Sequence, residues 1–485
     1  MNRTLKKITL PQTFVLIFGF LLIVTQFFYN RSLWLDEAYL ANNIINRDFI
    51  GLLSPLDDDQ VAPILFLWIS KAFSLLIPNS ELGLRLFPLL CFSFSILLFY
   101  KILKIIFQKD FVITICLVLF IFNPTVIYYS SEFKQYAVDV FAGLLVLYFT
   151  ITHHKNKRFL PLLLIGIFGL FLSNVMPIML FTSGIYLLYN LKTQKNKDKL
   201  QTTKLFYLFL FWLISFIIFY ALFVYKHPSR DYMLNYWSFA FLPLNPFSGE
   251  FYVFIVMKTD MIFNYLLAFG LLGYVLMIIY FIGIYQARRE KNYSFIILFT
   301  FPVITHLLLS ACHLYPFEKR LILYTIPCII ITMASVFEKN DYPIKLSKVY
   351  FEYLFSGFAL FLFFKESFPF KTEEIKPMIN FLNKNAKNEE TFYIYRGTRP
   401  AFDFYQSTNF FTKANPIIYG KKAIENKEDY ISEIVKIQRP FWILFTHVFY
   451  DEEEFILEQL KEKGFNYSRH FSQDGGSAYY YPKKD

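Results

Sequence analysis

The sequence predicts an α-helical protein that crosses a membrane many times and ends in a small α/β domain. Three observations lead to this expectation. Hydrophobic residues make up 56% of the chain and the mean hydropathy is +0.41. Only 18% of the residues are charged, against about 25% in average soluble proteins. After residue 364 the composition changes abruptly to a polar one rich in Lys, Glu and Asn. The chain is therefore neither a soluble single domain nor disordered, since disorder needs the opposite balance.

The apolar stretches predict about eleven crossings, because a transmembrane helix needs about 20 mainly apolar residues. The first, 10–28, follows Arg3, Lys6 and Lys7, and no small-residue cleavage site comes after it. We therefore expect an uncleaved helix with a cytoplasmic N-terminus. The later crossings are expected at 83–106, 111–129, 136–152, 159–173, 174–190, 205–225, 259–285, 293–311, 320–337 and 349–364.

The apolar stretch 61–77 decides the topology. If it crossed the membrane, the basic groups at 101–109, 153–158, 192–199 and 286–291 would all face outward. If it lies flat or re-enters, all four groups face the cytoplasm, as the positive-inside rule requires. We therefore expect this stretch to be interfacial and the C-terminus to be extracytoplasmic. A transmembrane domain would then span 1–364, with a first extracytoplasmic loop at 29–82, and a soluble extracytoplasmic domain would span 365–485.

The tail has the alternating pattern of a small α/β domain. Helices are expected at Glu373–Asn383, Pro400–Tyr405 and Glu452–Lys463, and strands at Thr391–Tyr395, Phe441–Thr446 and Ala478–Tyr481. Asp474, Gly475 and Gly476 predict a turn before the last strand.

The net charge of +11 comes mostly from short basic runs between apolar stretches, so it does not indicate a nucleic-acid-binding face. The four cysteines lie in or beside apolar segments without CxxC spacing, which argues against structural zinc and a disulfide framework.

Two adjacent acids, Asp36 and Glu37, follow the first apolar stretch in the outer loop. An anion at a membrane interface needs compensation. Asp36 is a candidate general base, since a carboxylate near an acceptor hydroxyl can take its proton. The alternative is structural: both acids would favour the positive end of an interfacial helix.

A second polar group follows the span at 111–129. At helical spacing, Glu132, Gln135, Tyr136 and Asp139 would share one face. Such a face entering an apolar helix is expected to line a cavity rather than to contact lipid. The alternative, an interfacial pair of Glu132 with Lys134, leaves Asp139 without explanation.

Other polar residues carry weaker signals. Asp57, Asp58 and Asp59 could recruit a divalent cation, but they fit a solvated loop better. Glu81 and Arg85 are spaced as an i,i+4 pair. Arg320 opens an apolar stretch and could bind phosphate through its guanidinium or reach the headgroups. Two sets remain without a compelling role: His227, Arg230 and Asp231 in the large outer loop, and the structural His153 and His154 in a basic cytoplasmic turn.

Together these segments resemble the dolichyl-phosphate-mannose protein mannosyltransferase superfamily. This superfamily includes bacterial members of glycosyltransferase family 39, such as the aminoarabinose transferases, built on the glycosyltransferase C fold. Leu33–Ala38 looks like the Asp-Glu motif of the family, and Ser131–Ala137 is similar to its Ser-x-Glu-x-Arg-x-Tyr stretch, with Lys134 where Arg is commoner. Gln60–Phe66 resembles the Pro-Pro-Leu-Tyr-Tyr segment, with Ala62 replacing the first proline. Ser80-Glu81 with Arg85-Leu86, and Tyr315-Pro316 with Arg320, match two further stretches. The resemblance runs in order through about residues 10–340.

The resemblance implies an inverting membrane glycosyltransferase that moves a sugar from a polyprenyl phosphate to an acceptor hydroxyl at the outer face of the cytoplasmic membrane. The acceptor would be a lipid, a polysaccharide or a protein. By position, Asp36 would be the general base, with Glu37 beside it. Lys134, Arg320 and Tyr136 would bind the donor phosphate. Glu132 and Asp139 would line the cavity, where the family pattern also allows a divalent cation, Mg²⁺ or Mn²⁺. The chain departs from that pattern at the second site, where relatives often have Asp and this chain has Tyr136 or, one turn later, Asp139.

Two other classes of protein compete with the enzyme. A transporter or lipid flippase should have polar or broken helices at mid-membrane and internal repeats. This chain has its charges at the outer ends of helices and no repeat. A structural membrane subunit would leave Asp36, Glu132 and Asp139 unexplained.

Overall fold

The computed structural model is mostly helical and describes residues 7–78, 80–156, 159–193, 199–225, 227–268, 270–339, 348–421, 427–438 and 440–483. Arg3 and Lys6, and the parts 157–158 and 194–198 of the predicted basic groups, lie outside the described residues. Contacts group the chain into two units. The helical unit comprises 1–27, 61–69 and 86–367, and the mixed unit comprises 28–60, 70–85 and 368–485. Most of the predicted outer loop 29–82 therefore groups with the C-terminal tail, except 61–69, and a domain boundary at 364 stays a prediction.

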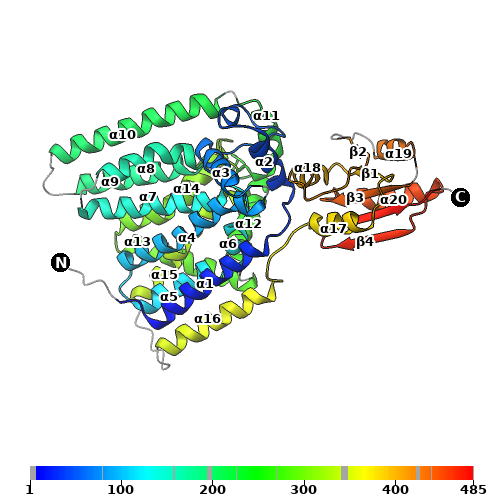
Figure 1. Ribbon diagram of the computed structural model, residues 1–485. Coiled ribbons are helices and arrows are strands. Elements are labelled where there is room, and N and C mark those ends of the chain that lie inside the picture. The colour runs from blue at the N-terminus through cyan, green and yellow to red at the C-terminus, as the bar shows by residue number, and fades with distance from the viewer. Residues whose placement is uncertain are drawn as a thin grey trace. The chain divides into compact units, whose positions relative to one another are not determined.

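The helical unit contains long helices joined by short turns (Figure 1). Its elements are α1 (Leu10–Tyr29), α4 (Glu81–Ile106), α5 (Asp110–Ile121), α6 (Pro124–Ser130), α7 (Tyr136–Asn156), α8 (Phe159–Leu172), α9 (Met176–Thr193), α10 (Lys199–Phe219), η2 (Tyr220–Val224), α11 (Arg230–Tyr236), η3 (Ser238–Ala240), α12 (Gly249–Asp260), η4 (Met261–Leu266), η5 (Gly270–Leu272), α13 (Gly273–Arg289), α14 (Tyr293–Ala311), η6 (Lys319–Thr325), α15 (Ile326–Lys339) and α16 (Lys348–Lys365).

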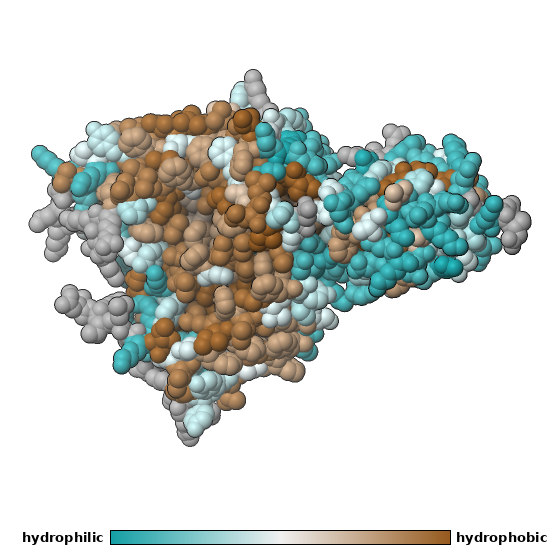
Figure 2. Space-filling model, in the orientation of Figure 1, coloured by the Kyte–Doolittle hydropathy of each residue, from teal (hydrophilic) through white to brown (hydrophobic). Residues whose placement is uncertain are grey.

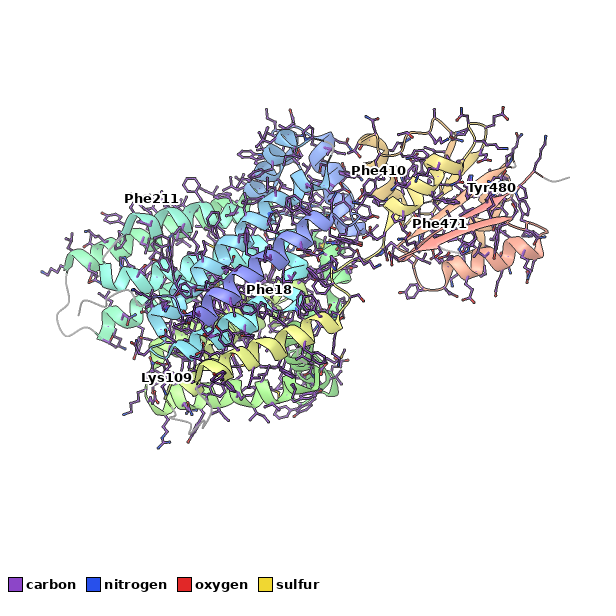
Figure 3. All side chains as sticks on the ribbon, turned by 60° about the horizontal axis from the view of Figure 1, so that its bottom comes forward. Phe18, Lys109, Phe211, Phe410, Phe471 and Tyr480 are labelled. Atoms are coloured by element: carbon purple, nitrogen blue, oxygen red, sulfur yellow. The ribbon has the colours of Figure 1, made fainter. Side chains whose placement is uncertain are left out.

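The composition of these helices makes the chain a multi-pass membrane protein. In the described part of the chain, six helices are long and apolar enough to cross a membrane, or seven if α5 and α6 form one bent span. Apolar side chains cover most of the middle of the visible surface of the helical unit, and polar ones gather toward its edges (Figure 2). Phe211, on α10, points outward (Figure 3) and is largely exposed, as expected of a side chain that contacts lipid. Each of the eleven predicted crossings corresponds to a helical element, although α8, α9, α13 and α16 are shorter or more polar at their ends.

Two predicted crossings are not continuous helices. The stretch 111–129 is broken between α5 and α6, which meet at a bend of 60°. Asn123 caps α6 by accepting a hydrogen bond from the N–H of Val126, and Pro124 begins the new helix. The stretch 259–285 is broken between η4 and α13, where Ala268 and Gly270 have positive φ. Left-handed residues cannot continue a right-handed helix.

Helices α1 and α5 lie side by side and run in the same direction. Near their starts, Gln12 Nε2 donates to the carbonyl oxygen of Asp110 at 3.2 Å. Near the end of α5, the ring of Phe122 meets Phe18 at 5.9 Å, and a Cβ on Gly19 would clash with Ile121. The two helices therefore end on the same side of the helical unit.

The apolar stretch 61–77 forms α3 (Ile64–Leu76), a helix of 13 residues. At 1.5 Å per residue it is about 20 Å long, whereas a hydrocarbon core is about 30 Å thick. Its length agrees with the expectation that this stretch does not cross the membrane.

The mixed unit contains a five-stranded sheet in the order β2-β1-β3-β5-β4 (Figure 1). Its elements are α2 (Leu35–Asn46), η1 (Gly51–Leu53), α17 (Ile375–Asn385), β1 (Thr391–Ile394), α18 (Arg399–Ser407), β2 (Ile417–Tyr419), α19 (Glu428–Ile434), β3 (Phe441–Thr446), α20 (Glu452–Glu462), β4 (Arg469–Gln473) and β5 (Gly476–Tyr481). Strand β1 pairs in parallel with β2 and with β3. Strand β5 pairs antiparallel with β3 and with β4. The side chains of β1 and β3 are mostly buried, and a core forms around Tyr393, Ile443 and Leu460.

The predicted tail elements are confirmed with small shifts at their ends, and β3 matches its predicted range. The turn before β5 is also confirmed, since Asp474 and Gly475 both have positive φ, as a tight two-residue hairpin requires. Phe471 and Tyr480 lie on the two strands that this turn joins (Figure 3). The sequence did not predict β2, α19 or β4, because β2 has three residues and β4 has a mostly polar, exposed sequence.

Candidate active site

Asp36 and Glu37 lie in the first turn of α2, in the mixed unit. Trp34 is the N-cap residue, and its N–H donates to Glu37 Oε2 at 3.4 Å. Glu37 thus satisfies one of the backbone donors that a helix start leaves unbonded. Asp36, one residue earlier, is half-buried, and its carboxylate lies at the positive end of the helix dipole. The structural interpretation of the pair therefore holds for Glu37, and Asp36 is the more accessible acid.

The carboxylate of Glu37 is completely buried, with 0% of the residue exposed, between two arginines. Oε2 accepts hydrogen bonds from Arg31 Nη1 at 2.7 Å and from Arg85 Nη2 at 2.9 Å, and Oε1 accepts from Arg85 Nε at 3.0 Å. Arg85 also donates to the carbonyl oxygens of Arg31 and Ser32 at 2.6 and 3.1 Å. These bonds fix the start of α2 against the start of α4.

Glu81 and Arg85, the predicted i,i+4 pair, interact through their charges, but no direct hydrogen bond or ion pair joins them among the described contacts. Arg85 donates to Glu37 instead, and Glu81 forms an ion pair with Lys376 at 2.9 Å. Glu81 also accepts a hydrogen bond from the hydroxyl of Tyr405 at 2.8 Å. Spacing along one helix favoured a local partner, but both side chains are buried, and tertiary neighbours compete for them there.

In the helical unit, the turn 131–135 joins α6 to α7, and Glu132 and Lys134 are both buried. Glu132 and Gln135 both precede α7, so of the predicted single helical face only Tyr136 and Asp139 lie on this helix. All four members of the predicted face are nevertheless buried: Glu132, Gln135, Tyr136 and Asp139. Buried charged and polar groups in an apolar helix end agree with a role in a site rather than with lipid contact.

Asp139 lies one turn into α7 and is 2% exposed. Its Oδ1 accepts a hydrogen bond from the hydroxyl of Ser173 at 2.6 Å. Its Oδ2 is buried without a hydrogen-bond partner among the described residues, as is Oε1 of Gln135. A buried acceptor that lacks a donor is costly, so these oxygens are available to a ligand or to water.

Arg320 lies at the start of η6, with its guanidinium between two aromatic rings. Its Cζ is 5.7 Å from the ring centroid of Tyr136 and 5.6 Å from that of Trp237. The neighbouring Lys319 places its ammonium 4.0 Å from the ring centroid of Tyr265. These ring contacts orient two adjacent cations, Lys319 and Arg320, at the start of η6. Both cations are partly exposed, as are the rings of Trp237 and Tyr265, whereas Tyr136 is buried.

Two further groups hold the loop before η6. His306, buried on α14, hydrogen-bonds to the carbonyl oxygen of Pro316 at 3.0 Å and to the hydroxyl of Tyr324 at 3.1 Å. Glu318 forms an ion pair with Lys258 of α12. Burial, and then the nearby Asp139 carboxylate, raises the pKa of Tyr315 in this loop well above its usual value, so its hydroxyl stays protonated. The segment that carries Arg320 is thus tied to α12 and α14.

The carboxylates of the described residues were expected to hold a cation if the family pattern applied. Across the described ranges, no group of three or more His, Cys, Asp or Glu side chains could hold a metal ion. Asp57 forms an ion pair with Arg47, and Asp57 and Asp58 are exposed, in agreement with a solvated loop. We therefore assign no step to a divalent cation.

The structure brings together some of the expected site residues. Arg320 lies near Tyr136, and Tyr136 begins the helix that carries Asp139. Glu132 and Lys134 precede that helix directly, whereas Asp36 and Glu37 belong to the other unit. The sequence did not predict the partners of these residues, namely Arg31, Ser173, Trp237, Tyr265 and Lys258. The only sequence signal for Arg31 was its place next to the acidic pair, and Trp237 lay in a loop without a motif.

The fold and these helix-end clusters define a class: polytopic membrane proteins with the glycosyltransferase C fold and a small C-terminal α/β domain. Residues 61–223 match the family model described as dolichyl-phosphate-mannose-protein mannosyltransferase. No curated protein sequence matches the chain.

Solved structures give the fold over the full length. The chain is similar to ArnT from Cupriavidus metallidurans in the apo state, with a TM-score of 0.57, 10% identity, and coverage of 97% of this chain and 98% of ArnT. The same protein bound to undecaprenyl phosphate matches with a TM-score of 0.57, 10% identity and coverage of 96% and 97%. An oligosaccharyltransferase from Archaeoglobus fulgidus, in complex with Zn and sulfate, matches with a TM-score of 0.50 and 12% identity over 97% of this chain and 73% of that one. These matches confirm the resemblance and the fold class that the sequence motifs indicated.

Proposed function

We propose that this protein is an inverting membrane glycosyltransferase that moves a sugar from a polyprenyl phosphate to an acceptor hydroxyl. The observation that carries the proposal is the full-length match of fold to ArnT, one structure of which contains undecaprenyl phosphate. The family model over 61–223 supports the same activity. The proposed location is the outer face of the cytoplasmic membrane, the side on which the positive-inside rule predicts the loops that carry Asp36 and Arg320.

The packing of α1 against α5 shows from which side of the helical unit the chain leaves toward each acidic segment. Both helices start on one side of the helical unit and end on the other. The chain leaves α1 directly into the loop with Asp36, and it leaves α5 through α6 into the turn with Glu132. Both segments therefore start from the same side of the bundle.

The proposed chemistry is a direct displacement. The acceptor oxygen attacks the anomeric carbon while the Asp36 carboxylate takes the hydroxyl proton. The bond from the anomeric carbon to the phosphate oxygen breaks, and its electron pair leaves with the polyprenyl phosphate. Arg320 and Lys134 stabilise the negative charge on this leaving group, which is commonly the largest catalytic term. Tyr136 holds Arg320 in place by the ring contact described above.

Glu37 has a different proposed role from Asp36. Because its carboxylate is buried and bonded to Arg31 and Arg85, it orients the start of α2. Glu132 and Asp139 are proposed to line the acceptor side of the cavity, where the unbonded oxygen of Asp139 can accept a hydrogen bond from a substrate hydroxyl.

Turnover by the purified protein tests the proposal. The protein is incubated with a panel of undecaprenyl-phosphate sugars and a lipid extract as acceptor, and released undecaprenyl phosphate is measured. We expect Asp36→Asn to lower kcat by at least about 100-fold, as for loss of a general base. Asp58→Asn, the same change on an exposed acid of the same loop, should keep wild-type turnover. Full activity of Asp36→Asn would refute the assignment of the base. A protein that binds undecaprenyl phosphate but never releases it from a sugar would favour the transporter or flippase.

Stereochemistry and location need separate measurements. The anomeric configuration of the product should be opposite to that of the donor by NMR, and retention would exclude direct displacement. For location, single cysteines at Asp57 and at Lys192, in a Cys312→Ser background, are labelled in intact cells with an impermeant maleimide. Both positions are exposed. Only the first should react, and equal labelling would overturn the topology.

A further inference from the structure

The short chain segment between α1 and α2 is hydrogen-bonded to the C-terminal tail. The N–H and the hydroxyl of Ser32 both donate to Glu374 Oε2, at 2.9 and 2.7 Å. The N–H of Leu33 donates to the hydroxyl oxygen of Tyr405 at 2.9 Å. The hydroxyl of Ser32 also accepts from the N–H of Lys376 at 3.1 Å. Two consecutive backbone groups are thus held by residues more than 340 positions later in the chain.

A second carboxylate supports these contacts. Glu81 accepts from the hydroxyl of Tyr405 at 2.8 Å and forms an ion pair with Lys376 at 2.9 Å. Tyr405 therefore accepts from Leu33 and donates to Glu81 through one oxygen. Burial, and then the Glu81 carboxylate, raises the pKa of Tyr405 well above its usual value, so this hydroxyl remains a donor at every physiological pH. Glu81 and Glu374 are both buried, and buried charges are tolerated only when bonded in this way.

The tail also contacts α2 beyond its start. Nδ2 of Asn42 donates to the carbonyl oxygen of Pro400 in α18 at 2.9 Å. The ring of Trp34 lies 6.3 Å from that of His447, which is itself bonded to Glu373 at 3.0 Å. The helix that carries Asp36 is therefore held by the tail along its length.

These contacts determine where Asp36 lies. Asp36 follows Leu33 by three residues, within the first turn of α2, so any shift of the backbone at 32–33 moves its carboxylate. A proton-accepting group must lie within about 2.6–3.2 Å of the proton donor, and a misplacement of about 1 Å can lower the rate about 100-fold. Within α2, Glu37 caps the helix start by accepting from the N–H of Trp34, and the tail contacts add to this local cap.

We infer that the C-terminal tail is a positioning element of the site, in which Glu374 and Tyr405 hold the segment 32–33 and thereby the Asp36 carboxylate. The predicted effect on turnover rests on the proposed function. The predicted effect of Glu374 and Tyr405 on the backbone at 32–33 does not. The tail has its own core around β1 and β3. The ring of Tyr405 packs against Phe404 and Phe410 within the tail, whereas its hydroxyl is bonded to Leu33 and Glu81.

The test compares two buried tyrosines that undergo the same change. Tyr405→Phe removes the hydroxyl that bonds to Leu33 and Glu81. Tyr393→Phe, the matched control, removes a hydroxyl that bonds to Glu433 at 3.0 Å within the tail. Ser32→Ala removes the other hydroxyl of the contact.

Hydrogen exchange of the full-length protein in detergent measures the structural part. In Tyr405→Phe, amide exchange in the peptide that covers 30–35 should rise about five- to tenfold, the effect of losing one hydrogen bond, and it should not rise in Tyr393→Phe. Unchanged exchange in Tyr405→Phe would overturn the inference, whatever the protein catalyses.

Turnover measures the functional part. In Tyr405→Phe and Ser32→Ala, kcat should fall about 10- to 100-fold, as expected for a misplaced base, while KM for the donor stays within about twofold and Tyr393→Phe stays at wild-type kcat. If Tyr405→Phe raised amide exchange in 30–35 but left kcat unchanged, the proposal that the tail positions Asp36 would be refuted. Absence of turnover in the wild type, with raised exchange in Tyr405→Phe, would refute the proposed function alone.

Discussion

Replacing Glu37 with glutamine should strongly destabilise the mixed unit. Glu37 is 0% exposed, Arg31 is 2% and Arg85 is 1%, so all three charges are removed from water. Glutamine has nearly the same shape but no charge, and its amide group would face an arginine donor. It therefore loses at least one of three charge-assisted hydrogen bonds and leaves two arginines buried beside a neutral group. Breaking a buried pair costs about 3–5 kcal/mol, and one charged hydrogen bond is worth about 1.5–3 kcal/mol, so we expect a loss of about 3–5 kcal/mol.

Thermal unfolding of the protein in detergent, followed by circular dichroism, measures this loss. For a unit of this size a loss of 1 kcal/mol lowers Tm by about 2–4 °C, so Glu37→Gln should lower Tm by about 10 °C. The control is Glu454→Gln, the same change at an exposed position of α20, which should change stability by no more than about 0.5 kcal/mol. The double variant Glu37→Gln/Arg85→Met should lose less stability than the sum of the losses in the two single variants, because the two residues are bonded to each other. A Tm of Glu37→Gln within about 2 °C of the wild type would refute the claim that the Glu37 carboxylate is needed to compensate the buried charges of Arg31 and Arg85.

Three further predictions concern other parts of the chain. Arg320→Gln should weaken binding of undecaprenyl phosphate about 10- to 100-fold in a titration, the worth of one charged hydrogen bond, whereas Arg288→Gln, exposed at the end of α13, should bind normally. The raised pKa of Tyr405 means that the folded state favours the protonated hydroxyl, so its contribution to stability is complete below about pH 10 and is lost as the pH rises above that value. Tm should therefore fall less steeply between pH 10 and 11 in Tyr405→Phe than in the wild type, and equal slopes would contradict the burial of this hydroxyl. Gly283→Ala should lower Tm, because its Cβ would lie 2.2 Å from a backbone carbonyl oxygen of α15, and overpacking costs about 1–3 kcal/mol. Gly357→Ala meets nothing within 4 Å and should leave Tm unchanged or slightly higher.

The crossings could be predicted because hydropathy is a local property of the chain. Runs such as 10–28 and 293–311 need no partner to indicate a helix of membrane length. Breaks were harder to predict. Asn123-Pro124 is a recognisable helix start, but the apolar residues around it concealed it. The break before α13 depends on the left-handed backbone of Ala268, which no sequence pattern indicated.

The candidate site was predicted in part for the same reason. Asp36, Glu132 and Arg320 stand out because they are charged residues at the ends of apolar stretches, where a charge needs an explanation. Their partners do not stand out. Glu81 with Arg85 had the spacing of a helical pair, yet Arg85 bonds to Glu37 and Glu81 bonds to Lys376.

By itself the sequence determined that this is a multi-pass helical membrane protein with a polar α/β tail, and which residues could carry chemistry, since both follow from side-chain type and local periodicity. The tertiary structure alone decided what each of those residues contacts. Glu37 meets Arg85 across 48 positions, and Ser32 meets Glu374 across 342. Such distant pairs are selected when buried charges and backbone donors find partners during packing, and burial depends on every neighbouring element at once.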